Sequence, residues 1–344
     1  EHVHKAHEED VPQVRPADRG AVRQVVPPLE VRLEVRGVFV VRAFRRVESL
    51  HREGFHRGRF RRESSGEGRL GGGEGIELGP ILDEFSELVK SGVRAVLVHG
   101  GSHETNLVSE QLGHPPTFIK SPSGHESRRT DRTTLEIFEM VYCGKTNKGI
   151  VEHLQTRGVN ALGLSGIDGG LWKGKRKGAI RAVDDEGRTT IIRDDLSGKV
   201  ESCDAALINL LLDSGRTPVL TPPALAVDGD DPGKSVAINV DADRAAAITA
   251  AALGADELLL LSNVPGVLAD PSDRSTLIAS TAEAGIDAVR EAAGGRMKNK
   301  VLAAEEALNG GVKRSVIGSA NGENPIAAAR AGAGTVFEPT ANPA

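Results

Sequence analysis

Three polar residues at alternate positions, Asn239, Asp241 and Asp243, are the first candidates for chemistry in this sequence. They lie between an apolar run and an alanine-rich segment with the length of a helix, and a second apolar run, Leu258–Leu261, leads into the turn Ser262–Gly266. This order predicts a strand, a polar turn, a helix, a buried strand and a second turn. Because open α/β sheets bind ligands at the carboxyl ends of their strands, both turns are predicted to line a ligand site.

Two glycine-rich stretches are candidates for binding an anion through backbone N–H groups. The first is LGGGEG at 70–75, for which a flexible linker is the alternative. The second is His99–Ser102, with Gly100 and Gly101 at its centre, between a strand-like run and a predicted helix. The start of that helix favours a phosphate or a carboxylate. His99 could be catalytic, although a histidine at a strand end more often makes a structural hydrogen bond.

Single basic residues near helix starts could bind anionic groups of a substrate. Arg128 stands just before Thr130-Asp131, a predicted helix cap, where its guanidinium group could hold a carboxylate through two hydrogen bonds. Lys300 immediately precedes the predicted helix Val301–Asn309, where a lysine opposes the helix dipole unless an anion lies nearby. Ordinary surface exposure is the alternative for both residues.

A cluster of positive charge follows in an otherwise acidic region, at Lys173, Lys175, Arg176, Lys177 and Arg181. Thr189–Arg193 alternates as expected for the return strand of a hairpin after the turn Asp185-Glu186-Gly187. A basic hairpin would suit an acidic macromolecular partner. A solvated sheet edge protected by lysines is the alternative.

Apolar runs alternate with amphipathic segments from residue 69 onward, which predicts an α/β protein with a parallel central sheet. One helix is predicted to begin at Thr130-Asp131 and to end near Gly144, and a second helix spans Asn147–Arg157. At 344 residues the chain can bury a large core, in more than one lobe.

The composition excludes several classes of protein. With 39% hydrophobic residues, 26% charged residues and a net charge of −5, the chain has the composition of a globular protein and not of a basic nucleic-acid binder. Cys143 and Cys203 provide neither a disulfide framework nor a metal site. No apolar run approaches a membrane span and no signal peptide with an apolar centre is found, so a cytoplasmic location is expected.

Residues 1–68 differ from the rest of the chain. They are rich in arginine, as in the run Arg57–Arg62, and they lack amphipathic periodicity outside Leu29–Val41. A basic arm that binds an acidic surface is one interpretation. A disordered or out-of-frame extension is the preferred one, because charge runs without a fold around them are usually solvated.

Eight motifs, in this order, resemble the acetylglutamate kinase branch of the amino acid kinase family. They are LGGGEG at 70–75, LVHGGS at 97–102, SRRTD at 127–131, NKGIV at 147–151, GLSGIDGGL at 163–171, AINVDADRAAA at 237–247, LLLSNVPGV at 259–267 and GRMKNK at 295–300. Within the branch, Ser102, the SRRTD motif and the basic stretch are similar to archaeal and Thermus-type enzymes. Those enzymes act on aminoadipate or glutamate carried by the small acidic protein LysW.

This resemblance implies an open αβα sandwich with a mainly parallel central sheet and two lobes. Residues 69–253 would bind the acyl substrate and residues 254–344 the nucleotide. The implied reaction is ATP-dependent phosphorylation of the side-chain carboxylate of LysW-linked glutamate or aminoadipate to an acyl phosphate, in arginine or lysine biosynthesis. Mg²⁺ would be bound through the nucleotide, and the partners would be LysW and a second copy of the chain. Free N-acetylglutamate kinase and a non-catalytic amino-acid sensor are the alternatives.

The resemblance also assigns residue roles. Lys300 would stabilise charge on the transferred phosphoryl group, and Asp243 would orient the catalytic lysines. The substrate would be bound by Gly100, Gly101, Arg128 and Asn239. The nucleotide would be held by Gly71, Gly72, Ser262, Asn263 and Gly266. The carrier protein would be bound by Lys173, Lys175, Arg176 and Lys177.

The chain departs from the family pattern at Arg69, where the first strand of relatives ends in a catalytic lysine. Arginine keeps the charge but is bulkier and planar, so it is not an equivalent substitute. The residues before it, Glu63–Gly68, do not have the pattern of an apolar strand. The hypothesis is that residues 1–68 arise from a frame error, in which case the chain lacks a central strand as well as the lysine.

Overall fold

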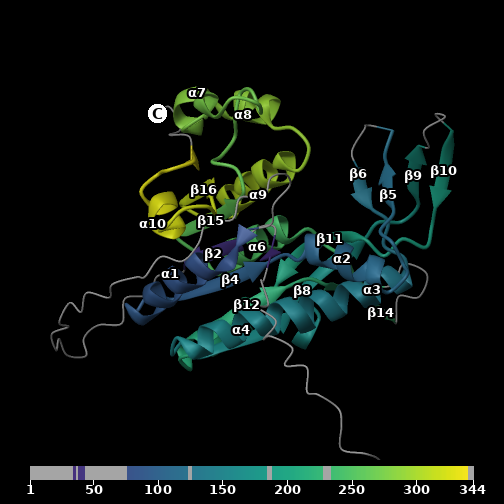
Figure 1. Ribbon diagram of the computed structural model, residues 1–344, viewed down its shortest axis with the longest axis horizontal. Helices are drawn as coiled ribbons and strands as arrows, with labels where there is room; N and C mark the ends of the chain where they lie inside the picture. Colours follow the sequence, from purple (N-terminus) through teal and green to yellow (C-terminus); the bar gives the residue numbers. More distant parts are fainter. Residues whose placement is uncertain are drawn as a thin grey trace, which may run out of the picture. The chain divides into compact units, whose positions relative to one another are not determined.

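The computed structural model describes residues 34–35, 38–42, 76–122, 126–183, 188–227 and 234–339, with the backbone alone for 34–35, 38–42, 77 and 126. All of these residues belong to one compact unit, Leu33–Ala344. The described part contains a large mixed sheet, two four-stranded sheets and helices on both faces of the large sheet (Figure 1).

The central sheet has the strand order β17-β16-β15-β2-β4-β12-β7. Five strands are parallel to one another: β16 (Arg314–Ser319), β15 (Glu257–Ser262), β4 (Ala95–His99), β12 (Thr217–Thr221) and β7 (Ala161–Ser165). Two strands run antiparallel to them, β17 (Thr335–Phe337) and β2 (Val38–Arg42). The predicted αβα fold with a mainly parallel sheet is therefore confirmed.

Continuous apolar runs form the central strands because both faces of the sheet are covered. Every residue of β4, β12 and β15 is buried. Within β15, Leu258 and Leu260 pack in one hydrophobic core, while Leu259 and Leu261 pack in the other. Side chains alternate between the two faces of a strand, so one apolar run contributes to both cores.

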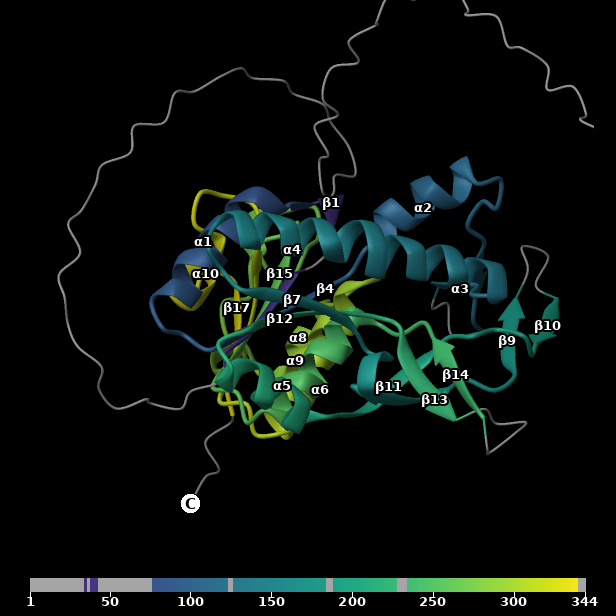
Figure 2. The same ribbon diagram turned by 90° about the horizontal axis from the view of Figure 1, so that it is seen from below.

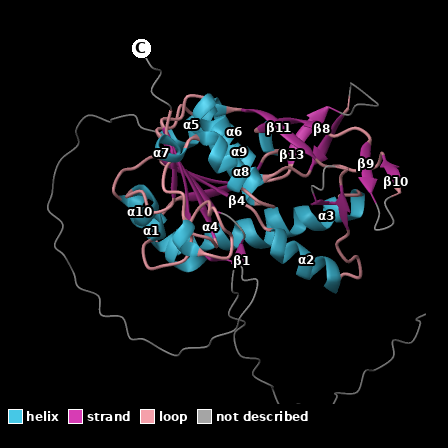
Figure 3. Ribbon diagram, turned by 90° about the horizontal axis from the view of Figure 1, so that it is seen from above, coloured by secondary structure: helices cyan, strands magenta, loops and turns pink. Residues whose placement is uncertain are grey.

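Helices form a layer on each face of the sheet (Figure 3). The first core takes residues from α5 (Ala205–Asp213), α6 (Ala242–Ala252), α8 (Ile286–Ala292) and α9 (Met297–Asn309). The second core takes residues from α1 (Leu78–Lys90), α4 (Asn147–Thr156) and α10 (Pro325–Arg330). The remaining short elements are β1 (Glu34–Val35), β3 (Ile76–Glu77), α7 (Thr281–Ala284) and the 3₁₀ turns Asp168–Gly170 and Arg274–Thr276.

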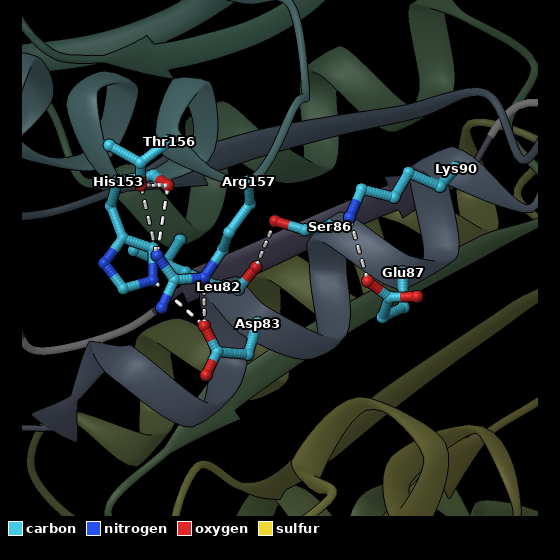
Figure 4. Close-up of polar contacts among 8 residues, drawn as sticks. All are labelled: Leu82, Asp83, Ser86, Glu87, Lys90, His153, Thr156 and Arg157. Atoms are coloured by element: carbon cyan, nitrogen blue, oxygen red, sulfur yellow. Dashed lines mark hydrogen bonds and ion pairs between the residues drawn. The ribbon is translucent and has the colours of Figure 1, made fainter. Parts of the chain in front are cut away.

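Polar contacts join α1 to α4 in the second layer (Figure 4). Asp83 of α1 contacts His153 Nε2 at 3.2 Å and accepts a hydrogen bond from Arg157. Partial burial is the main cause that lowers the pKa of His153. Within α1, Ser86 Oγ donates to the carbonyl oxygen of Leu82 at 2.7 Å, which satisfies a hydroxyl in the apolar face. The contacts of Asp83 therefore join α1 to the carboxyl-terminal end of α4.

The helix predicted to end near Gly144 continues instead. α3 (Arg132–Glu139) passes through a π-helical segment, Met140–Thr146, directly into α4. The prediction of two separate helices is wrong because Gly144 is exposed and costs only about 1 kcal/mol in a helix. The buried side chains of Phe138 and Ile150 on either side of the segment outweigh that cost.

Two four-stranded sheets complete the described structure. One has the order β10-β9-β5-β6, with β10 (Thr189–Ile192), β9 (Ile180–Val183), β5 (Phe118–Lys120) and β6 (Glu126–Arg128). The other has the order β11-β8-β13-β14, with β11 (Gly198–Cys203), β8 (Trp172–Arg176), β13 (Ala224–Val227) and β14 (Ser235–Ile238). Trp172 Nε1 donates to Thr249 Oγ1 of α6 at 3.0 Å, which attaches the second small sheet to the main core.

The predicted basic hairpin is only partly correct. The return strand is β10, and it pairs antiparallel with β9, as predicted. Lys173, Lys175 and Arg176, however, lie on β8, which pairs with β11 and β13 in the other sheet. Figure 2 shows β11 and β13 apart from β9 and β10. β8 and β11 approach closely at Gly174, where a Cβ atom would lie 2.4 Å from the carbonyl oxygen of Lys199. The close approach at Gly174 allows β8 to pair with β11. The positive charges and the residue alternation along β8 did not indicate this partner.

One strand of the central sheet comes from the segment 1–68. β2 lies between β15 and β4 and is antiparallel to both. It belongs to Leu29–Val41, the stretch of that segment with apolar periodicity, and its position corrects the expectation that the chain lacks a central strand. Most of residues 1–68 lie outside the described residues, so their disorder or out-of-frame origin stays a prediction.

Candidate active site

Two of the predicted site turns follow strands of the central sheet, whereas Asn239 and Asp243 follow β14, an antiparallel strand of the second small sheet. Gly100-Gly101 follows β4, and the turn Ser262–Gly266 begins at the end of β15. Asn239 follows β14, and Asp243 lies in the first turn of α6. The roles predicted for Arg69, Gly71 and Gly72 stay predictions, because these three residues lie outside the described ones.

Lys300 and Asp243 form a nearly buried ion pair. Lys300 Nζ lies 2.7 Å from Asp243 Oδ1, and the two side chains are 11% and 13% exposed. Burial raises the pKa of Asp243 to about 6, and the positive charge of Lys300 partly opposes this rise. The carboxylate therefore fixes an ammonium group at the start of α9, and the catalytic roles of the two residues stay predictions.

A second contact fixes the same helix start. Asp241 caps α6 by accepting a hydrogen bond from the backbone N–H of Arg244 at 3.1 Å. Its other carboxylate oxygen accepts a hydrogen bond from Asn299 Nδ2 at 2.9 Å. The alternate polar residues Asp241 and Asp243 thus join the first turns of α6 and α9, which holds Lys300 in place.

The raised pKa of Asp243 predicts an acidic limit on activity. Below pH 6 the carboxylate takes up a proton and stops holding the Lys300 ammonium group, so we expect kcat to fall about tenfold per pH unit. The same shift affects stability. The pKa of Asp243 is about 6 in the native state and 3.8 in the unfolded state, so between these values the native state binds the proton more tightly. The contribution of Asp243 to the free energy of unfolding therefore falls as the pH rises through that range. A pH–rate profile checks the expectation, and Asp243→Asn should remove the limb. A limb with a midpoint below pH 5 would contradict the assignment.

The first turn of α9 and the turn after β15 are the two described candidates for binding a nucleotide. The first turn of α9 contains no acidic residue, so an ammonium group and the positive end of a 13-residue helix occur together there. Ser262 is buried, and its carbonyl oxygen accepts a hydrogen bond from Ala320 N–H at 2.6 Å. Asn263 beside it is exposed, and its carbonyl oxygen accepts a hydrogen bond from Asn321.

Gly266 allows the turn Ser262–Gly266 to pack closely against β17. A Cβ atom there would lie 2.7 Å from Thr335 Oγ1 and 2.9 Å from Thr335 N, so only glycine fits against β17. Val267 N–H donates to Thr335 Oγ1 at 2.8 Å. The turn after β15 is therefore packed in one position, which would let its exposed side meet a nucleotide without rearrangement.

Arg128 is half-buried beside the start of α2 (Ser102–Gln111). Its Nη2 atom donates to the carbonyl oxygen of Ser102 at 3.1 Å and to Ser102 Oγ at 3.2 Å, and it contacts Asn106 Oδ1. Its Nη1 atom is buried without a hydrogen-bond partner. Burial is the main cause that lowers the pKa of Arg128. A buried donor without a partner among the described residues is costly, so Arg128 stays a candidate for binding a substrate carboxylate.

Tyr142 determines the shape of the Gly100-Gly101 turn. A Cβ atom at Gly101 would lie 2.9 Å from both Cδ2 and Cε2 of the Tyr142 ring. The ring stacks on Phe138 with centroids 3.7 Å apart, so it cannot move away. Burial raises the pKa of Tyr142 to about 12, which keeps the phenol neutral. Sequence reasoning missed Tyr142, because nothing along the chain shows that it packs beneath a turn 41 residues away.

Asn239 belongs to a network around the predicted helix cap. Its Nδ2 atom donates to Thr130 Oγ1 at 3.0 Å. Asp195 is fully buried and accepts hydrogen bonds from the backbone N–H groups of Thr130 and Ser197 at 2.9 and 2.8 Å. The network ties the SRRTD motif to β11 and β14, so it positions Arg128 relative to Asn239. Asp195 carried no sequence signal of this role.

His99 is a structural histidine. Burial lowers its pKa to about 4, so the ring is neutral. Its Nδ1 atom lies 2.8 Å from the carbonyl oxygen of Gly100, and its Nε2 atom lies 3.1 Å from Asn147 Nδ2. Asn147 also donates to the carbonyl oxygen of Val219 at 3.0 Å. The pair joins β4, β12 and α4, which favours the structural alternative over a catalytic one.

The predicted carrier-binding residues fall into two groups. Lys173, Lys175 and Lys177 are exposed. Arg176 instead donates to the carbonyl oxygens of Asp195 at 2.9 Å and Arg193 at 2.7 Å, so it also fixes the loop before β11. An open hollow of about 570 Å³ lies beside it, lined by Asp131, Arg132, Thr133, Arg176, Asp194, Leu196 and Val236.

Two kinds of site are absent from the described residues. They contain no group of three or more histidine, cysteine, aspartate or glutamate side chains placed to hold a metal ion. None of the helices within the described ranges is long and apolar enough to cross a membrane.

Comparison with solved structures identifies the fold. N-acetylglutamate synthase from Neisseria gonorrhoeae aligns with a TM-score of 0.60 at 22% identity, over 77% of this chain and 56% of that one. Carbamate kinase from Giardia lamblia aligns with a TM-score of 0.53 at 16% identity, over 75% of this chain and 89% of that one. At such identities the likeness concerns the fold alone.

Sequence comparison is more specific. A [LysW]-aminoadipate kinase from Deinococcus radiodurans is 53% identical over 78% of this chain and 89% of its own length, and one from Thermus thermophilus is 49% identical over 78% and 98%. An acetylglutamate kinase from Methanopyrus kandleri is 37% identical over 71% and 93%. The model of the amino acid kinase family matches residues 65–319. The predicted resemblance is therefore confirmed, and the chain belongs to the amino acid kinase family.

Proposed function

We propose that this protein transfers the terminal phosphoryl group of ATP to the side-chain carboxylate of an aminoadipyl or glutamyl group carried on LysW. The product is an acyl phosphate for lysine or arginine biosynthesis in the cytoplasm. Two observations carry the proposal: the nearly buried Lys300–Asp243 pair at the start of α9, and the buried Nη1 atom of Arg128, which has no hydrogen-bond partner among the described residues. The relatives from Deinococcus radiodurans and Thermus thermophilus support the choice of a carrier-linked substrate.

The reaction needs positioning and positive charge more than it needs a proton acceptor. One carboxylate oxygen forms a bond to the terminal phosphorus as the bond to the bridging oxygen of ADP breaks. No general base is required, because a carboxylate is already ionised at neutral pH. Lys300, held by Asp243, would stabilise charge on the transferring oxygen atoms, and a donor held in place before the reaction lowers the barrier most effectively. Mg²⁺ would arrive with the nucleotide and neutralise part of its charge.

The test is phosphorylation of three acyl substrates, with the acyl phosphate trapped as a hydroxamate. Carrier-linked aminoadipate, carrier-linked glutamate and free N-acetylglutamate are supplied in turn with MgATP. The proposal expects turnover of a carrier-linked substrate at least a hundredfold above that of free N-acetylglutamate. Preference for free N-acetylglutamate would establish the second candidate function, which the relative from Methanopyrus kandleri suggests.

We expect the lysines around β8 to bind the acidic carrier. Lys175 lies directly opposite Lys199 in the β8–β11 pair, and like charges across strands are unfavourable unless an anionic surface covers them. Changing Lys173, Lys175 and Lys177 together to glutamine should raise the KM for the carrier about tenfold at low salt and leave the KM for ATP unchanged. Lys90→Gln on α1 is the matched control. Equal carrier KM values for the triple variant and the wild type would exclude this surface.

We further propose a homodimer that forms through α2 and the adjoining π-helical segment. Lys145 of the π-helical segment pairs with Glu104 of α2, and His114, just after α2, contacts Thr134 of the preceding helix α3. Exposed apolar side chains occur on both, at Leu107, Leu112 and Met140. Sedimentation equilibrium gives the molecular mass in solution. We expect a dimer for the wild type and a monomer for Met140→Glu, and a monomeric wild type would contradict the proposal.

A further inference from the structure

We propose that Arg296 is a second substrate-binding arginine, which holds the non-reacting carboxylate of the acyl substrate together with Arg128. The inference rests on the proposed function and adds a residue that the predicted site did not include. It gives the GRMKNK motif a role in recognising the acyl group as well as in phosphoryl transfer.

Arg128 can accept a ligand from one side only. Its Nη2 atom is occupied by Ser102 and Asn106, and Phe118 lies beneath the guanidinium carbon, 5.5 Å from the ring centroid. The buried Nη1 atom has no partner. Arg128 also makes no ion pair with a described carboxylate, so its charge needs an anion from outside the described residues.

Arg296 is placed to supply the opposite side of such a site. It is the residue before α9, with φ −70° and ψ −20°, so it continues the helical path. Residues four apart lie on the same face of a helix, which puts Arg296 one turn before Lys300 on the face that meets Asp243. The Asn299–Asp241 and Lys300–Asp243 contacts fix this turn. Within the described ranges, the exposed side chain of Arg296 makes no hydrogen bond or ion pair.

Two hydrogen bonds link the segments of the two arginines. Asn299, three residues after Arg296, donates to Asp241, and Asn239, two residues before Asp241, donates to Thr130, two residues after Arg128. Consistent with this placement, burial lowers the pKa of Arg128, Tyr142 opposes the shift, and the charge of Arg296 adds to it. Two guanidinium groups that approach each other without a carboxylate partner are repelled, and a bound anion removes this cost. Tyr142, beneath Gly101, forms part of the same site.

The chemistry of the substrate identifies the anion. An amino-linked glutamyl or aminoadipyl group has two carboxylates, and the one that reacts must approach the phosphoryl group at Lys300. The other stays ionised throughout, and two guanidinium forks match its planar geometry. The non-reacting carboxylate is therefore the group that fits between Arg128 and Arg296.

The test compares Arg296→Gln with Lys298→Gln, which removes the same charge from the other side of the same turn. Each variant and the wild type receive the acyl substrate that the wild type phosphorylates, and its α-carboxamide, in which the non-reacting carboxylate is neutral. KM and kcat are measured for the acyl substrate and ATP. Calorimetry gives the dissociation constants of the acyl ligands without ATP.

We expect Arg296→Gln to raise the KM and the dissociation constant of the acyl substrate roughly 10- to 100-fold, with kcat and the KM for ATP within threefold of the wild type. The wild type and Lys298→Gln should bind the α-carboxamide roughly 10- to 100-fold more weakly than the acid. Arg296→Gln should discriminate between the two by less than threefold, and Arg296→Lys should lie between.

Three results would overturn the inference: equal effects of the two glutamine variants, full discrimination by Arg296→Gln, or an effect confined to the KM for ATP. Failure of the proposed function gives a different result. Carrier-linked and free acyl substrates both keep the non-reacting carboxylate, so a wild type that uses only free N-acetylglutamate would overturn the carrier assignment alone. Calorimetry gives the dissociation constants of the acyl ligands for wild type and Arg296→Gln, so it tests the role of the two arginines even if no substrate is phosphorylated.

Discussion

Replacing Lys300 with methionine is expected to lower kcat about a thousandfold. The Lys300 ammonium group is held 2.7 Å from Asp243 at the start of α9, where it requires no reorganisation to meet a transferring phosphoryl group. Methionine keeps most of the side-chain volume and removes the charge. The KM values for both substrates should change by only a few-fold, because the interaction strengthens mainly in the transition state. Single-turnover kinetics with trapping of the acyl phosphate measure the effect.

The control is Lys298→Met, an equal loss of charge from an exposed position on the same turn of α9. Its kcat should stay within threefold of the wild type. Loss of Lys300 removes the charge that lowers the pKa of Asp243, so that carboxyl group should become protonated at neutral pH and the variant should remain folded. A Lys300→Met protein with normal thermal unfolding and a kcat within tenfold of the wild type would exclude Lys300 from the chemistry.

Gly101→Ala is expected to lower kcat/KM about a hundredfold. The added methyl group would lie 2.9 Å from two carbons of the Tyr142 ring, and the Tyr142–Phe138 stack leaves the ring no space to withdraw. The Gly100-Gly101 turn must therefore shift, together with the start of α2 and the Ser102 atoms that hold Arg128. Steady-state kinetics with the acyl substrate measure the loss.

Gly79→Ala provides the comparison for this prediction. Gly79 lies in α1, and a Cβ atom there would meet nothing within 4 Å. Alanine is the better helix former, so this variant should keep full activity and gain slightly in stability. If Gly101→Ala matched Gly79→Ala in activity, the close approach of Tyr142 would have no functional consequence.

The proposed mechanism depends on contacts between distant parts of the chain. Asp241 and Asp243 at the start of α6 fix the first turn of α9, and Asn239 is joined through Thr130 to the segment that contains Arg128. Each functional group is thus held by a residue from another element. A displacement of about 1 Å in such a site can cost a hundredfold in rate, so these supporting contacts matter as much as the groups themselves.

Much of this arrangement was predictable from residue patterns. Leu258–Leu261 predicted a buried strand because four consecutive apolar residues need cover on both faces, and the structure divides them between two cores. Asp241 and Asp243 were candidates because polar residues after a strand lie at the ligand-binding edge of a parallel sheet. The ordered motifs also predicted the family, and the comparisons confirm it.

Other features depended on residues that meet only in the folded chain. Gly144 suggested a helix end, yet the helical path continues because the packing of Phe138 and Ile150 outweighs a weak local preference. The lysines of β8 were assigned to a hairpin, although their strand pairs with β11 and β13. Strand pairing is decided by contacts far apart in sequence, which alternation along one strand cannot specify.

The fold class, the family and most residues proposed for the site follow from residue patterns alone, because periodicity and short motifs report local structure and the ends of strands. The packing of Tyr142 beneath Gly101 and the contacts of Arg176 with the loop before β11 exist only in the folded chain. Packing, burial and charge act through space, and a linear pattern contains no distance between residues that are far apart along the chain.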